Sequence, residues 1–332
     1  MLTSLELCAG AGGTALGLEA AGFHPLALVE LDPASCATLR ANRPAWNVLE
    51  KDIRTFSAHS FRGVDLLSAG VPCPPFSVAG KQLGADDERD LFPEALRLVS
   101  ECQPRAVMIE NVRGLLSPTF RRYREQISQK LESLGYVVRW RLLNASDFGV
   151  SQLRPRLVLV GIARDFAEGF AWPEPCLESA PTVGQLLFDE MVSRGWRGAA
   201  AWSRRANSIA PTLVGGSKLH GGPDLGPTRA RRAWAELGVD GRGLANEPPV
   251  PDFFGMPRLT LQMAALVQGF PRDWEFSGGK TRAYRQIGNA FPPPVPEAVA
   301  TSIRRALLGS AKKLVSLPSR TSRTEPQAAL FA

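Results

Sequence analysis

Short apolar segments alternate with helical patterns over about the first 165 residues, and this alternation limits the possible folds more than any other feature of the chain. The apolar segments have the length of buried strands and fall at 4–7, 25–29, 47–49, 65–68, 106–109, 136–142 and 157–162. Helical patterns lie between them at 14–21, 33–42, 91–102 and 120–134. The helix at 33–42 has Asp32 as its N-cap and Pro33 at its first position. We predict an α/β fold with a doubly wound, mainly parallel sheet, in which ligands bind beyond the carboxyl ends of the strands.

The pattern changes at about residue 165. From 165 to 257 the periodicity fails, and Gly, Pro, Trp and Arg are frequent, which indicates a smaller, loop-rich domain. Helical patterns return at 260–267 and 295–308, so we expect the chain to re-enter its first domain there. The predicted organisation is a first domain at 1–164, an inserted domain at 165–257, a return to the first domain at 258–308 and a disordered tail at 309–332.

The charge of the chain favours a polyanionic partner. Its net charge is +7, from 39 Lys and Arg residues against 32 Asp and Glu residues. Part of the excess lies at 200–235, where six cationic residues stand against one acidic residue. They are Arg204, Arg205, Lys218, Arg229, Arg231 and Arg232, against Asp224. This segment is a candidate phosphate-binding surface.

Several classes of protein are disfavoured. No apolar run approaches the roughly 18 residues that a membrane span needs, and the N-terminus lacks the pattern of a signal peptide, so we expect a cytoplasmic protein. The five cysteines have no CxxC spacing and there are only three histidines, so neither a disulfide framework nor a metal site is expected.

A glycine-rich loop follows the first predicted strand and leads into a helix. It consists of Cys8, Ala9, Gly10, Ala11, Gly12 and Gly13, and such a loop lets its backbone approach a ligand closely. Glu30 ends the second strand, where an acid in such folds accepts hydrogen bonds from ribose hydroxyls, and Asp52 after the next strand could accept one from an adenine amino group. Together they favour an adenosine-containing cofactor, although ordinary turn glycines and surface acids would give the same letters.

Cys73 follows the strand at 65–68 and is held between prolines, so it combines a stiff backbone with a position at the ligand edge. It is either a nucleophile or a small buried apolar residue. Glu110 ends the next strand and reaches the same edge. Because His24, His59 and His220 lie in no suggestive motif, hydrolysis through a cysteine–histidine pair is disfavoured. A carboxyl beside a cysteine suits the activation of a pyrimidine ring.

Gln152, Arg154 and Arg156 alternate with Leu153 and Pro155 where the last predicted strand begins. Alternation places all three polar side chains on one face. They could hold a planar base and its phosphate, or they could form a solvated strand end.

The ordered set of these blocks resembles the DNA cytosine-5 methyltransferases from about residue 5 to residue 299. The blocks are the glycine loop, Glu30, Asp52, Pro72-Cys73, Glu110-Asn111-Val112, the set of Gln152, Arg154 and Arg156, and Gln286-Ile287-Gly288-Asn289-Ala290. The resemblance implies a mixed, Rossmann-like sheet that binds S-adenosylmethionine, and a small target-recognition domain that faces it across a DNA-sized cleft. It implies no metal.

The resemblance also implies a mechanism. Cytosine is flipped out of the duplex, the Cys73 thiolate attacks C6, and Glu110 donates to N3. Carbon 5 is then methylated, loses its proton, and Cys73 is eliminated. Arg154 would steady the base and favour the thiolate, and Arg156 would support Glu110.

By the same resemblance, Glu30 binds the ribose, Asp52 binds the adenine amino group and Ile53 packs beside it. The glycine loop and Asn289 bind the methionine end. The complete expected cofactor set is Cys8, Ala9, Gly10, Ala11, Gly12, Gly13, Glu30, Leu31, Asp52, Ile53, Pro72 and Asn289. Residues 77–90 resemble the mobile loop that closes over DNA. The expected DNA contacts are Ser77, Lys81, Gln82, Arg229, Arg231 and Arg232.

Two positions depart from the family pattern. Cys8 replaces a common phenylalanine that packs on the adenine, which changes the packing expected there and leaves the reaction unaffected. Met263 and Leu266 replace residues that are usually charged, so an ion pair is absent.

Other functions remain open at this point. A transfer RNA cytosine-5 methyltransferase shares the motifs, but the long segment at 165–257 favours a reader of duplex DNA. A DNA-binding relative with an inactive site would have lost Cys73, Glu110 or the glycine loop. A nicotinamide oxidoreductase would leave Cys73, Glu110 and Arg154 without a role. We expect a monomeric bacterial or phage enzyme from a restriction-modification system, with a cognate restriction endonuclease acting on the same DNA site.

Overall fold

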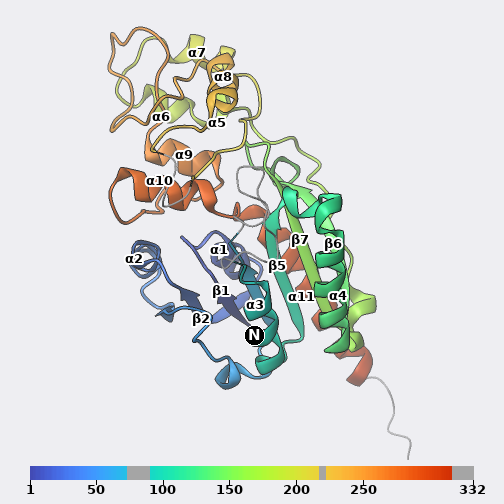
Figure 1. The fold of residues 1–332 in the computed structure, drawn as a ribbon. Helices are drawn as coiled ribbons and strands as arrows, with labels where there is room; N and C mark the ends of the chain where they lie inside the picture. Colours follow the sequence, from blue (N-terminus) through green and yellow to red (C-terminus); the bar gives the residue numbers. More distant parts are fainter. Residues whose placement is uncertain (73–89, 217–221, 316–332) are drawn as a thin grey trace, which may run out of the picture.

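A seven-stranded mixed sheet forms the centre of the molecule (Figure 1). The computed structural model describes residues 1–72, 90–216 and 222–315. The strands are β1 (Leu2–Leu7), β2 (Phe23–Glu30), β3 (Val48–Glu50), β4 (Leu66–Gly70), β5 (Ala106–Val112), β6 (Tyr136–Asn144) and β7 (Pro155–Ala163). Their order is β3-β2-β1-β4-β5-β7-β6, in which β1 to β5 are parallel and β7 runs antiparallel to both of its neighbours. The predicted sheet is confirmed.

Helices cover both faces of the sheet. Helices α3 (Phe92–Cys102) and α4 (Arg121–Ser133) pack in front of it as seen in Figure 1, over a core that includes Leu5, Leu67 and Val107. Helices α1 (Gly13–Ala20) and α11 (Pro294–Val315) pack together on the opposite face. Helix α2 (Pro33–Asn42) begins as predicted, because the Asp32 carboxylate accepts the Ser35 N–H at 3.1 Å.

The loop-rich segment at 165–257 begins with a 3₁₀ helix, Arg164–Gly169, that packs on α11, and its part from about residue 181 onward lies beyond the carboxyl ends of the parallel strands (Figure 1). Its described residues also form four short α-helices, α5 (Val183–Leu186), α6 (Phe188–Val192), α7 (Ala199–Arg205) and α8 (Thr228–Glu236). Buried indoles of Trp196, Trp202 and Trp234 supply much of its core. Each of these helices is at most nine residues long.

The chain then returns to the sheet through α9 (Leu261–Val267) and α10 (Lys280–Asn289). Helix α10 is absent from the predicted elements, and α11 continues to Val315 although the apolar pattern weakens after Leu308. The core of the loop-rich segment is continuous with Met263, Trp274 and Ile287 of the return. The domain boundaries at 164 and 257 remain predictions. Among the described residues, no helix is long and apolar enough to cross a membrane.

Glu6 is a buried carboxyl in the middle of β1. Glu6 is only 3% exposed, and this burial raises the pKa of its carboxyl well above the ordinary value of 4.5. A hydrogen bond with Thr14 acts in the opposite direction. The folded protein therefore retains a proton that the unfolded chain releases. This contribution to stability is complete below the unfolded pKa and is lost as the pH rises through the folded pKa.

We therefore expect Glu6→Gln, which cannot ionise, to become more stable relative to the wild type as the pH rises. Thermal unfolding of both proteins at pH 5 and pH 8 measures this. The difference in Tm between variant and wild type should be larger at pH 8. A difference that does not change with pH would show that Glu6 is not protonated in the folded state.

Candidate active site at the carboxyl edge of the sheet

The strand order places most of the predicted site residues along one edge. Because β3, β2, β1, β4 and β5 are adjacent and parallel, the segments that follow them lie in a row. Asp52 follows β3, Glu30 ends β2, the glycine loop follows β1, Pro72 follows β4, and Glu110 lies near the end of β5. The residues predicted to bind the cofactor and the predicted catalytic Glu110 thus share one edge of the sheet.

The glycine loop turns sharply between β1 and α1. Cys8, Gly10 and Gly12 have positive φ angles of 54°, 55° and 91°. A Cβ atom on Gly13 would lie 2.2 Å from the Phe291 carbonyl oxygen, so only glycine fits there. The loop is therefore shaped both by its own sequence and by the chain that returns near the C-terminus.

Glu30 fixes the start of this loop. Its Oε2 accepts the Gly10 N–H at 2.7 Å, and its Oε1 accepts those of Leu31 at 2.8 Å and Asp32 at 2.7 Å. Burial raises the pKa of Glu30, and the backbone donors act in the opposite direction. Leu31 is 56% exposed beside this carboxyl, so an apolar side chain is presented next to a polar hydrogen-bond acceptor.

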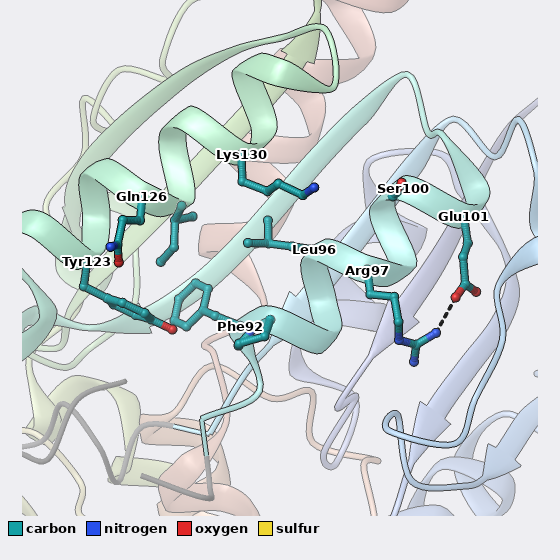
Figure 2. Close-up of a pocket in the computed structure, with 10 residues that line it drawn as sticks. Phe92, Leu96, Arg97, Ser100, Glu101, Tyr123, Gln126 and Lys130 are labelled. Carbon is teal, nitrogen blue, oxygen red and sulfur yellow. Dashed lines mark hydrogen bonds and ion pairs between the residues drawn. The ribbon is translucent and has the colours of Figure 1, made fainter. Parts of the chain in front are cut away.

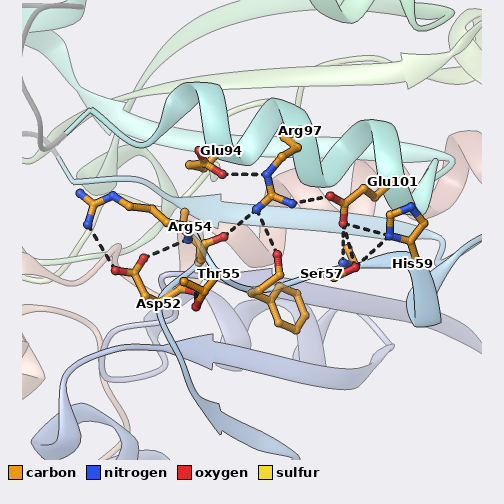
Figure 3. Close-up of polar contacts among 11 residues, drawn as sticks. Asp52, Arg54, Thr55, Ser57, His59, Glu94, Arg97 and Glu101 are labelled. Carbon is orange, nitrogen blue, oxygen red and sulfur yellow. Dashed lines mark hydrogen bonds and ion pairs between the residues drawn. The ribbon is translucent and has the colours of Figure 1, made fainter.

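Asp52 lies on the same side of the sheet, in a loop held by α3 (Figure 3). Its carboxylate pairs with Arg54 at 3.2 Å, while the next residue, Ile53, is buried. Arg97 of α3 donates to the Ile53 carbonyl at 2.8 Å and to the Phe56 carbonyl at 3.0 Å.

Two acids on α3, Glu94 and Glu101, hold Arg97 in place against the loop that contains Asp52. Glu94 accepts from Arg97 Nε at 2.8 Å, and Glu101 pairs with the same guanidinium. Glu101 also accepts the Ala58 N–H at 2.7 Å, so both ends of the loop are attached to one helix (Figure 3). Sequence reasoning missed Arg97; its only signal was the i, i+4 spacing to Glu101 on a predicted helix.

Glu110 forms a buried ion pair with Arg156. Arg156 Nε lies 2.7 Å from Glu110 Oε1, and the two side chains are 12% and 10% exposed. Burial raises the pKa of Glu110, while the charges of Arg156 and Arg154 act in the opposite direction. Glu110 is paired with Gly70 in the sheet, so it lies beside the end of β4. A carboxyl that retains its proton more readily than usual can donate a hydrogen bond at this point.

Arg154 and Gln152 form a junction between three parts of the chain. Arg154 is 1% exposed and donates to the carbonyls of Leu213 at 2.8 Å, Gly288 at 2.6 Å and Ala290 at 3.1 Å. Gln152 accepts the Leu213 N–H at 2.8 Å. These bonds connect the start of β7 to the loop-rich segment and to the end of α10. These bonds fix the Arg154 side chain at the junction, and its contact with a base stays a prediction.

Asn289 lies at the end of α10, between the loop-rich segment and the glycine loop. Its side-chain amide donates to the Gly216 carbonyl at 3.3 Å, while the following residues Ala290 and Phe291 pack on Gly13. Its contact with the methionine end of a cofactor stays a prediction.

Only some of the residues predicted to contact DNA lie in the described part of the chain. Arg229 and Arg232 are exposed and three residues apart on α8, so they share one face. Arg231 is half-buried and its side chain packs over Gly241. Cys73, Ser77, Lys81 and Gln82 lie outside the described residues.

Three buried or half-buried thiols in the described chain, those of Cys8, Cys36 and Cys102, are poor nucleophiles. Burial raises the pKa of Cys8 far above its ordinary value, and raises those of Cys36 and Cys102 to about 12. No group of three or more potential metal ligands occurs within residues 1–72, 90–216 and 222–315.

A separate hollow lies between α3 and α4, away from the strand ends (Figure 2). It has a volume of about 510 Å³, and Phe92 and Leu96 of α3 face Tyr123 of α4 across it. None of the described residues predicted for the site lines it. It therefore contributes nothing to the chemistry at the strand ends.

Comparison with solved structures identifies the class of this fold. The structure of a DNMT2 mutant from Spodoptera frugiperda superimposes with a TM-score of 0.63, covering 92% of this chain and all of that one at 16% identity. At that identity the likeness shows a shared fold alone.

Sequence comparison gives the family. The sequence model of the C-5 cytosine-specific DNA methylases matches residues 2–305. Type II methyltransferase M.NgoMIV of Neisseria gonorrhoeae is 54% identical over 92% of this chain and 98% of its own length. Type II methyltransferase M.NaeI of Lentzea aerocolonigenes is 57% identical over 92% of this chain and 75% of its own length. The chain belongs to the C-5 cytosine-specific DNA methylases, and the resemblance read from its motifs is confirmed.

The junction role of Arg154 predicts a large effect on stability. Arg154→Met would leave buried carbonyls without their donor, and we expect it to lower the free energy of unfolding by on the order of 3 kcal/mol. The half-exposed Arg40→Met, which removes an ion pair with Glu50, is the matched control and should cost less than about 1 kcal/mol. Urea unfolding of both variants makes the comparison, and equal losses would contradict the junction role.

Proposed function

We propose that this protein methylates carbon 5 of one cytosine in a specific short sequence of duplex DNA, as the modification enzyme of a restriction-modification system. The buried pair of Glu110 and Arg156, next to the strand that leads to Cys73, carries this proposal. Two relatives more than half identical to the chain are named Type II methyltransferases, which supports the setting. In this setting the enzyme acts as a cytoplasmic monomer, and its partners are duplex DNA and an endonuclease that cleaves the same sequence.

The proposed chemistry begins at Cys73. Its thiolate adds to C6 of the extruded cytosine while Glu110, whose pKa is raised by burial, gives a proton to N3. Electron density thereby moves to C5, which would take the methyl group as the carbon–sulfur bond of the sulfonium donor breaks and a neutral thioether leaves. Loss of the C5 proton to solvent and elimination of Cys73 restore the aromatic ring, and N3 returns its proton to Glu110. Arg156 holds the Glu110 carboxyl in place through their ion pair.

The residues at the other half of the edge suit S-adenosylmethionine, which supplies an electrophilic methyl group when bound. Glu30 and Asp52 offer carboxylate acceptors for hydroxyl and amino donors, and the exposed Leu31 offers an apolar surface to a ring. The φ angles of Cys8, Gly10 and Gly12 give the loop the sharp turn that a close backbone approach needs.

The proposed set around these residues is the one predicted from the motifs: the loop from Cys8 to Gly13, Glu30, Leu31, Asp52, Ile53 and Pro72. Asn289, at the end of α10, is retained in this set.

The experiment that tests the function uses tritiated S-adenosylmethionine with unmethylated genomic DNA, and transfer RNA in a parallel reaction. We expect label at C5 of cytosine within one short DNA sequence. Label only in transfer RNA would replace the proposal with its nearest alternative, and absence of label in both would overturn it.

Substitutions at the two reacting groups should separate chemistry from binding. Cys73→Ser should abolish methyl transfer and leave DNA binding close to normal, because the hydroxyl is a far weaker nucleophile. Glu110→Gln should reduce turnover by about 10²- to 10⁴-fold, since the amide cannot transfer a proton. Single-turnover rates and Kd for DNA measure both effects. Substantial turnover by the serine variant, or a wild-type rate for the glutamine variant, would remove the assigned role.

The cationic face of α8 is proposed to contact phosphates, together with Ser77, Lys81 and Gln82. Removing two contacts with Arg229→Ala and Arg232→Ala should lower the slope of log Kd against log salt by about 2. The half-buried Arg231→Ala should change it less. Arg62→Ala serves as the control, because Arg62 is exposed and precedes β4, at the amino edge of the sheet. A slope unchanged from that of the control would place the DNA elsewhere.

A further inference from the structure

The segment between α9 and α10, near the end of the chain, packs against the glycine loop. Between α9 and α10 the chain passes the carboxyl edge of the sheet, and there it places Trp274 against the loop. The indole is 1% exposed, and its Nε1–H donates to the Ala11 carbonyl at 3.2 Å, across 263 residues of sequence. This is a buried, long-range bond to the backbone of the loop that is proposed to hold the cofactor.

The ring also occupies space that the loop leaves for it. A Cβ atom on Gly12 would lie 3.0 Å from Trp274 Cζ2 and 2.8 Å from Leu39 Cδ2. Gly12 therefore allows the indole to pack directly beneath the turn. The ring is held on its other sides by Phe270, stacked at 6.1 Å, and by the Arg43 guanidinium, 5.3 Å from its centroid.

Hydrogen bonds attach the segment that carries the Trp274 indole to α2. Asn42 at the end of α2 donates to the Glu275 carbonyl at 2.7 Å and accepts the Glu275 N–H at 2.9 Å. Thr38, one turn earlier, accepts the Ser277 N–H at 2.8 Å. The segment that carries the indole is thus attached to α2 by three hydrogen bonds.

We propose that Trp274 is a positioning residue for the cofactor loop, which it holds in its binding conformation through the bond to Ala11 and the contact with Gly12. The proposal rests on the proposed role of this loop in binding S-adenosylmethionine. Trp274 touches neither substrate, so its effect should fall on affinity for the cofactor, with the rate of the chemical step and the affinity for DNA unchanged.

The chain offers a matched control in Trp46. Its ring lies 6.1 Å from that of Trp274 and is also buried, but its Nε1–H donates to Glu19 at 3.1 Å instead of to the loop. Substituting phenylalanine at either position removes one indole N–H and a similar volume from the same aromatic cluster. Only the variant at 274 removes a bond to the glycine loop.

The test measures Kd for S-adenosylhomocysteine by calorimetry, KM for S-adenosylmethionine, kcat and Kd for DNA in Trp274→Phe, Trp46→Phe and the wild type. Because Trp274→Phe loses one hydrogen bond, we expect Kd for S-adenosylhomocysteine and KM for S-adenosylmethionine to rise by about threefold to tenfold. We expect kcat and Kd for DNA to stay within about twofold. For Trp46→Phe all four should stay within that limit.

Asn42→Ala provides a second route should Trp274→Phe fail to fold. It removes the bonds to Glu275 at a half-buried position and should raise Kd for S-adenosylhomocysteine in the same direction. Equal effects of the two tryptophan substitutions, or cofactor affinity unchanged in both Trp274→Phe and Asn42→Ala, would overturn the positioning role. A wild-type protein that binds no S-adenosylhomocysteine would instead overturn the proposed function.

Discussion

The shared direction of β1 to β5 is the constraint on which the site depends. Parallel neighbours require crossover connections, and these bring every strand to its carboxyl end at the same edge. Acids and glycines separated by up to about a hundred residues, from the loop at 8–13 to Glu110, are thereby gathered in one row. The antiparallel β7 then inserts between β5 and β6, so that the side chain of Arg156 reaches Glu110 from the opposite direction.

Burial gives this row its chemical character. Desolvation raises the pKa of Glu110 above its ordinary value even with an arginine 2.7 Å away. The arginine prevents the full cost of burying a lone charge and fixes the direction of the carboxyl. The same edge therefore combines an acid that can transfer a proton with loops that accept hydrogen bonds from a ligand.

The sheet was predictable because each of its strands is a short apolar run between turn or helix signals, and the acids that end β2 and β5 could be placed by strand position alone. Side-chain direction across distant segments could not. Alternation placed Gln152, Arg154 and Arg156 on one face, yet Arg154 bonds to carbonyls from residues 213, 288 and 290, which lie far along the chain. Local patterns contain no information about such partners, and for the same reason they gave no sign of the contacts made by Arg97, Trp274 and Asn289.

The glycine loop has a further property because two of its supports come from the end of the chain. Phe291 closes on Gly13 and Trp274 on Ala11, whereas the loop itself is among the first residues to be made. During synthesis the loop must therefore wait for nearly the whole polypeptide before its surroundings are complete. An interrupted translation product that ends before residue 274 would contain the acids and glycines of this edge but would lack the contacts that Trp274 and Phe291 make with the loop. The ability to bind the cofactor therefore depends on synthesis of nearly the whole chain.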